Sequence, residues 1–76
     1  MNKEIVYSVV IDIERHKVQM RKMPCYALFV ADILPALHEY SQEDIKSALN
    51  ELVEEKRLKF GRTANDIHFA TQTGNK

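Results

Sequence analysis

The sequence is poor in the residues that form disulfides, phosphate-binding loops and unusual turns. Its 76 residues include one cysteine, two glycines, two prolines and no tryptophan. A single cysteine, Cys25, excludes an internal disulfide, and its place in an apolar run indicates a buried, inert thiol. Gly61 is the only glycine before the last residues of the chain, so the sequence has no glycine-rich loop for a phosphate group.

An excess of charge of either sign is also missing. Eleven Lys and Arg residues balance eleven Asp and Glu residues, so the net charge is zero. A non-specific nucleic-acid binder usually carries excess positive charge, and this composition does not indicate one. There is no apolar run of about 18 residues to span a membrane and no signal-peptide pattern. We therefore expect a cytoplasmic protein without a membrane partner.

The titratable residues form no recognisable catalytic or metal-binding set. His16, His38 and His68 are scattered, without the Cys-x-x-Cys or His-x-x-x-His spacing of a metal site. Cys25 has no identifiable base as a partner. We interpret His38 and His68 as surface residues. The sequence predicts no enzyme, no metal and no other cofactor, and it indicates no small-molecule ligand.

The hydrophobic and charged fractions, 45% and 29%, are those of an ordinary folded domain. We predict one domain over residues 1–71 and a frayed tail over residues 72–76. A chain of this size is near the lower limit for independent folding, so it gains much from a partner subunit.

The strongest structural signal covers residues 40–58, YSQEDIKSALNELVEEKRL. Ser41 stands at the position of an N-cap, with Asp44 three residues later as the acidic half of a capping box. Tyr40 and Ile45 are placed to form a hydrophobic staple. Apolar residues at helical spacing predict an amphipathic helix packed on a core. These residues are Ile45, Ala48, Leu49, Leu52 and Val53.

Residues 2–17, NKEIVYSVVIDIERHK, fit two patterns. A helix places Ile5, Val6, Val9, Val10 and Ile13 within one arc. A strand is also possible, because alternate residues are apolar and many are β-branched. We choose the helix, since the run is long, lacks Gly and Pro, and has an acidic start and a basic end that suit the helix dipole.

On such a helix, Tyr7 and Ile11 lie at i and i+4, away from the main apolar stripe. Isolated apolar residues are common on protein surfaces. A small domain also gains stability by burying such a patch against a second subunit. Both interpretations remain open, and the second predicts a homodimer interface at Tyr7 and Ile11.

Residues 26–31 are apolar and predict a short buried strand or the start of the next helix. Asp32 is expected to cap a short helix over residues 33–39, with Pro35 in its first turn. After the 40–58 segment, residues 58–69 alternate as a β-hairpin, with Leu58 and Phe60 on one strand. Gly61, Asn65 and Asp66 supply the turn between its strands.

This order of elements resembles the winged helix-turn-helix domain, most closely over residues 32–69. DILPALHEYSQEDIKSALNELVEEKRL is similar to the family's helix-turn-helix, and SALNELVEEKRL to its recurrent Ala-Leu run. The resemblance implies an α+β fold of three helices and a C-terminal β-hairpin wing, with a possible short strand between the first two helices. It implies a supporting helix at 33–39, a recognition helix at 42–57 and a wing at 58–69.

The expected core combines the apolar residues of every element. It consists of Ile5, Val9, Ile13, Leu28, Ile33, Leu37, Ile45, Leu49, Leu52, Leu58, Phe60, Ile67 and Phe69. The family commonly has Gly where the recognition helix ends, and this chain has Lys56 and Arg57 there. A non-Gly residue in a left-handed cap costs up to about 1 kcal/mol.

The resemblance implies a small DNA-binding regulator of transcription that acts as a homodimer on double-stranded DNA. Lys46, Ser47 and Asn50 are the candidates for base contacts. Arg57, Lys59 and Arg62 are the candidates in the wing region. A second basic cluster consists of Arg15, Lys17, Arg21 and Lys22.

Two other interpretations remain. All these cations can be solvated surface charges. Residues 42–57 include five acidic and three basic side chains, which disfavours phosphates and favours a protein-interaction or dimerisation module of the same fold.

Overall fold

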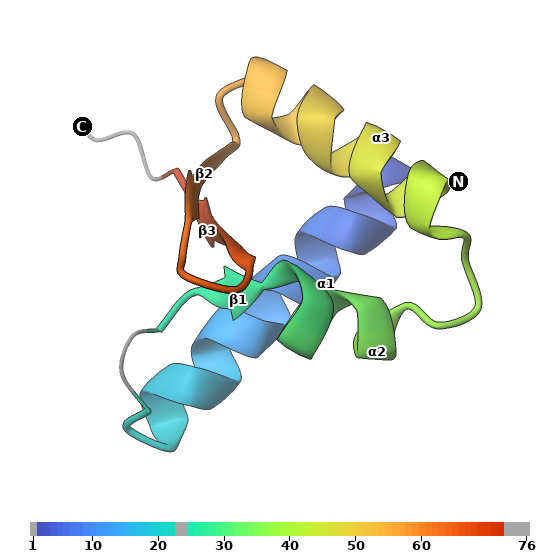
Figure 1. Ribbon diagram of the computed structural model, residues 1–76. Coiled ribbons are helices and arrows are strands. Elements are labelled where there is room, and N and C mark those ends of the chain that lie inside the picture. Colours follow the sequence, from blue (N-terminus) through green and yellow to red (C-terminus); the bar gives the residue numbers. More distant parts are fainter. Residues whose placement is uncertain (1, 23–24, 73–76) are drawn as a thin grey trace.

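The structure, a computed structural model, describes residues 2–22 and 25–72 (Figure 1). It is an α+β fold, as expected, in which α-helices pack with a three-stranded antiparallel sheet whose central strand is β3. In chain order the elements are α1 (Lys3–Gln19), β1 (Ala27–Leu28), the π-helical turn η1 (Phe29–Ile33), α2 (Leu34–Ala36), α3 (Gln42–Glu54), β2 (Leu58–Arg62) and β3 (Ile67–Thr71).

The N-terminal segment is helical, so the strand alternative for it is wrong. Asn2 caps α1, with its side-chain oxygen accepting a hydrogen bond from the Glu4 amide at 2.9 Å. The β-branched residues are accommodated because one face of α1 packs against α3 and β3. Packing therefore decides the structure of a segment whose intrinsic propensity was ambiguous.

The buried stripe of α1 is centred on Val6 and Val10, and not on the residues expected in the core. Val9 and Ile13 are only partly buried at its edge. Ile5 is 39% exposed, so its assignment to the core is wrong. The apolar arc is wider than the surface available to it, and the helix is rotated so that Ile5 lies outside the contact.

The second helical segment, η1 followed by α2, begins at Phe29 and ends at Ala36, whereas a helix over residues 33–39 was expected. Asp32 does not cap it: its carboxylate accepts hydrogen bonds from the Leu28 amide at 2.8 Å and from Lys17 Nζ at 2.6 Å. The Leu34 amide bonds to the Phe29 carbonyl, which gives the wide turn of η1. Pro35 follows this turn directly, within the first turn of α2, as the sequence predicted.

Helix α3 confirms the clearest sequence prediction. Ser41 is its N-cap, with Oγ accepting from the Asp44 amide at 3.1 Å. The helix ends at Glu54, three residues before the expected end at 57, because Lys56 adopts a left-handed conformation with φ 63°. The amides of Lys56 and Arg57 then bond back to carbonyls of the last turn, as in a Schellman motif.

The β-hairpin is also confirmed, with Phe60 opposite Phe69 and Arg62 opposite Ile67. Strand β1 is the short strand expected between the first two helices, and it pairs with β3. Figure 1 shows the hairpin at one side of the molecule, beyond the C-terminal end of α3. We predicted a frayed tail over residues 72–76. Of these residues only Gln72 belongs to the described part of the chain.

The core lies where α1, η1, α3 and the sheet meet. Phe60 was expected there but is 59% exposed, whereas Leu58, two residues earlier on β2, is fully buried. Leu28 and Ile67 are only half-buried. The buried apolar residues are Val6, Val10, Ala27, Phe29, Ile33, Leu37, Ile45, Ala48, Leu49, Leu52, Leu58 and Phe69. Among the helices of the described residues, none has both the length and the apolar character needed to cross a bilayer.

Candidate functional site

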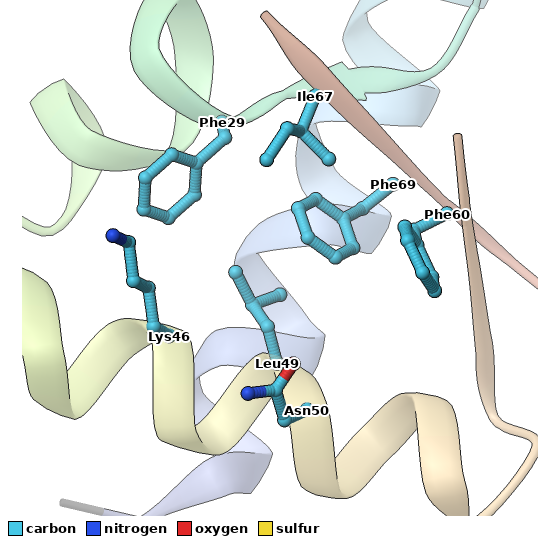
Figure 2. Close-up of a pocket in the computed structure, with 7 residues that line it drawn as sticks. All are labelled: Phe29, Lys46, Leu49, Asn50, Phe60, Ile67 and Phe69. Carbon is cyan, nitrogen blue, oxygen red and sulfur yellow. The ribbon is translucent and has the colours of Figure 1, made fainter. Parts of the chain in front are cut away.

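A pocket of about 150 Å³ opens between α3 and the hairpin (Figure 2). Lys46 and Asn50 reach its edge from α3. Its apolar walls come from η1, α3 and both hairpin strands. They consist of Phe29, Leu49, Phe60, Ile67 and Phe69. We call this the α3–hairpin pocket.

A second concavity, of about 390 Å³, adjoins the α3–hairpin pocket and shares Lys46 with it. Gln42 of α3 lines it, together with Arg62 and Asn65 of the hairpin. Lys46, Asn50 and Arg62 therefore share one surface, which we call the α3–hairpin face. Three of the six candidate DNA contacts are brought together here.

In the described part of the chain, the α3 residues that line the two concavities include no acidic residue. Gln42, Lys46 and Asn50 follow at intervals of four, so they lie along one side of the helix. By helical spacing, Asp44 and Glu51 lie on the opposite side of the helix. Glu54 follows Asn50 at the same interval, so an acidic residue extends this row beyond the part that lines the concavities.

Ser47 and Lys59 are exposed but line neither concavity. By helical spacing, Ser47 shares the outermost side of α3 with Glu43 and Glu54. This side is therefore partly acidic. Lys59 precedes Phe60 on β2, and successive side chains of a strand point to opposite faces. Neither residue joins the α3–hairpin face.

Arg57 is held in a clamp between α1 and the end of α3. Its guanidinium donates two hydrogen bonds to the Glu4 carboxylate, at 2.6 and 2.7 Å, and also approaches Glu55 at 3.6 Å. The hydrogen bonds from Arg57 hold the pKa of Glu4 below its ordinary value, and Glu4 raises the pKa of Arg57. Lys3 pairs with Glu55 in the same cluster. Arg57 is thus engaged within the molecule.

The expected dimer residues lie close to this clamp. The Arg57 guanidinium stacks over the Tyr7 ring, 4.3 Å from its centroid. Tyr7 is also partly buried against the core. Ile11 is half-buried. Part of the apolar patch expected for a second subunit is therefore covered by the protein's own side chains.

Asp66 anchors the hairpin loop to η1, a role that the sequence did not indicate. Its carboxylate accepts hydrogen bonds from the Val30 amide at 3.0 Å, the Ala31 amide at 3.2 Å and the Ile67 amide at 2.7 Å. The Asp66 amide also bonds to Thr63 Oγ1 at 2.9 Å, which closes the loop. Only its turn chemistry was visible in the sequence, since the partners at 30 and 31 are distant along the chain.

This anchoring changes the titration of Asp66. Desolvation by burial raises the pKa of its carboxyl, but the hydrogen bonds from backbone amides outweigh that effect and hold the pKa below its ordinary value. The carboxylate lies at the N-terminal end of η1, where a negative charge is favourable. It places the hairpin, with Arg62, beside Lys46.

The sequence suggested that His68 is a surface residue, and this is wrong. Its half-buried ring stacks on Tyr26, with centroids 4.1 Å apart and planes at 16°. It also lies across Gly61, its partner in the hairpin, where an added Cβ would be 2.6 Å from the ring. Among the described residues, buried Nδ1 of His68 has no hydrogen-bond partner. Gly61 is needed here for close approach and not for the turn.

The four residues of the second basic cluster have different surroundings. Lys17 is part-buried and bound to Asp32 and to the Tyr26 carbonyl at 2.8 Å, whereas Arg15, Arg21 and Lys22 are exposed. Cys25 is half-buried, so it is less buried than expected. Within residues 2–22 and 25–72, no three His, Cys, Asp or Glu residues are grouped as a metal site would need.

Comparisons of the chain with protein-family models, with curated proteins and with solved structures found no match. The function must therefore be argued from the α3–hairpin face itself.

Proposed function

We propose that the protein is a winged-helix DNA-binding regulator of transcription, with α3 as its recognition helix and β2–β3 as its wing. The observation that carries the proposal is the convergence of Lys46, Asn50 and Arg62 on one exposed face. The order of helices and strands, with β1 paired to β3 and a hairpin after α3, supports the same proposal.

The contacts follow from the chemistry of these three side chains. An α-helix fits the major groove, where Asn50 can bond bidentately to adenine and Lys46 can donate to guanine. Arg62 lies on the hairpin beside α3 and is suited to a backbone phosphate. The proposal assigns no DNA contact to Arg57, which is clamped to Glu4, or to Lys59, which lies on the other face of the hairpin.

A homodimer would present two copies of α3 to successive major grooves. Its proposed interface is centred on Ile11 and the part of Tyr7 that Arg57 leaves accessible. An apolar contact of this kind should respond little to salt. Sedimentation at about millimolar protein concentration tests it: a dimer supports the interface, and a species that stays monomeric contradicts it.

The test of DNA binding is a titration with mixed-sequence duplex DNA at low salt, followed by amide NMR signals. We expect saturable shifts at Lys46, Asn50 and Arg62. Lys46→Gln and Arg62→Gln should each weaken binding severalfold, whereas the matched control Lys59→Gln should not. If the amide signals of the α3–hairpin face do not change during the titration, the proposal is contradicted.

A second function has an observation of its own. Val30 and Phe60 line the two concavities of the α3–hairpin face and are 56% and 59% exposed. Exposed apolar side chains at a concave surface favour a protein partner. Such binding should persist at high salt, whereas binding to DNA phosphates weakens steeply. The salt dependence of binding therefore separates the two functions.

A further inference from the structure

The α3–hairpin pocket has the size of a single ring. Its volume of about 150 Å³ matches that of an engineered apolar cavity that holds benzene, which is also about 150 Å³. Leu49 and Phe69 form its buried wall, and Phe29 contributes a further buried ring. Phe60 stands at its edge, 59% exposed. Figure 2 shows Phe29, Leu49 and Phe69 around a common space, with Phe60 beside Phe69.

The polar groups at this pocket select the sign of a ligand's charge. Among the described residues that line the pocket, Lys46 is the one with a charge, and its Nζ lies 5.9 Å from the centroid of the Phe29 ring. The neighbouring Asn50 supplies an amide that can donate a hydrogen bond. Apolar walls with a few convergent polar groups are the usual features of a small-molecule site. A cation and an amide donor together suit a carboxylate.

We propose that the α3–hairpin pocket binds a small aromatic monocarboxylate. The ring enters between Leu49, Phe60 and Phe69, and the carboxylate bonds to the Lys46 ammonium and the Asn50 amide. Binding covers the exposed face of Phe60, which the chain itself leaves open to solvent. The charge of Lys46 and the single-ring volume set this ligand class apart from larger or cationic molecules.

The probe for this site is phenylacetate, titrated into the whole chain without nucleic acid and followed by amide NMR signals. We expect saturable shifts at the pocket residues with a dissociation constant of about 1 mM, as suits so few atoms. 2-Phenylethylamine, with the same ring and the opposite charge, should bind at least about tenfold more weakly. Absence of saturation, or equal affinity for the two probes, would overturn the proposal.

Variants then test the two halves of the site separately. Lys46→Gln should remove the preference for phenylacetate over 2-phenylethylamine, and the exposed Lys59→Gln should leave it unchanged. Phe60→Ala should weaken both probes, because it removes ring contact from an exposed position that folding does not require. Retention of the charge preference in Lys46→Gln would contradict the assigned orientation.

A last measurement separates the ligand from a second copy of the chain. The same amide signals are recorded during dilution of the protein alone. Constant signals support a pocket that is free to take the carboxylate. Concentration-dependent shifts at Leu49, Phe60 and Phe69 would show that another copy occupies the pocket, and would overturn the proposal. The titration contains no DNA, so its result is independent of the proposed DNA binding.

Discussion

Single residues fix the position of the hairpin relative to the helices. Asp66 holds the hairpin loop on η1 through the amides of Val30 and Ala31. His68 fills the space between Tyr26 and Gly61 on the other side of β3. Asp66 lies 36 and 35 positions from Val30 and Ala31, and His68 lies 42 positions from Tyr26, so neither the anchor nor the ring stack follows from local sequence patterns.

The Asp66 anchor predicts an acid-sensitive contribution to stability. Asp66→Ala should lower the free energy of unfolding at pH 7 by about 1–2 kcal/mol, since it removes a capping acceptor from several backbone amides. The folded-state pKa is depressed, so the stabilisation is complete above the unfolded value of 3.8 and is lost as the pH falls through the folded value.

Urea unfolding of the wild type and Asp66→Ala at pH 7 and at pH 3 measures this effect. The difference between the two proteins should shrink at pH 3. Glu4 and Glu55 also have lowered pKa values, which hydrogen bonds from Arg57 and Lys3 respectively cause, and they are present in both proteins. A difference that is equal at the two pH values would contradict the anchoring role of the carboxylate.

Gly61 gives a prediction of a different kind, because its role is steric. An alanine there would place Cβ 2.6 Å from the His68 ring, and the stack on Tyr26 limits where the ring can move. Gly61→Ala should therefore destabilise the protein by about 1–2 kcal/mol. In a His68→Ala background the same change should cost less, since the obstructing ring is gone. Additive effects in this double-mutant cycle would contradict the steric explanation.

At the residue scale, the sequence predicted the apolar faces of the elements well. It predicted less well which individual side chains on those faces are buried. Ile33, Ile45 and Leu52 are in the core as expected, because each belongs to an element covered on its apolar side. Phe60 and Leu58 alternate correctly on β2, but Leu58 is fully buried and Phe60 is 59% exposed. Which end of a strand the other elements cover is a long-range property, so periodicity alone could not show that position 60 is uncovered.

At the scale of elements, prediction succeeded where local signals agree. Helix α3 has a capping residue, an apolar stripe and a staple position that point to the same structure, and the hairpin has two alternating strands with turn residues between them. The segment before α3 was predicted less well. Its π-turn depends on the Asp32 carboxylate, which bonds to Leu28 and Lys17 rather than to the start of a helix.

The end of α3 supplies a prediction at this scale. Lys56 has φ 63°, a conformation that glycine adopts without steric cost. Lys56→Gly should therefore raise the free energy of unfolding by about 0.5–1 kcal/mol, despite the greater freedom of glycine in the unfolded chain. Thermal unfolding followed by circular dichroism measures the change.

The matched control is Glu54→Gly, two residues earlier and inside α3. Glycine at a right-handed, exposed helical position should lower stability by up to about 1 kcal/mol. Opposite signs for the two glycine substitutions are the expected result. Destabilisation by both would mean that the left-handed cap at Lys56 is not formed in solution.

For the whole molecule, the distribution of charge matters more than its sum. The chain is neutral, yet the α3 residues at the two concavities are not acidic. Lys46 and Arg62 share a concavity there with Asp66, whose carboxylate is bonded to backbone amides. The sequence could identify each of the proposed DNA contacts but not their grouping, since the latter depends on how the hairpin is anchored. The same anchoring forms the apolar pocket, which no sequence motif indicated.

The central claim is that this grouping is a DNA-binding face, and the salt dependence of duplex affinity tests it most directly. Arg62 is the phosphate contact proposed for each copy of the chain, which predicts a slope of log K against log salt of about −0.9 per copy and about −2 for the homodimer. Arg62→Gln should reduce its magnitude by about 0.9 for each copy that binds, and Lys59→Gln should leave it unchanged. A slope near zero, or equal slopes for the wild type and Arg62→Gln, would contradict the claim.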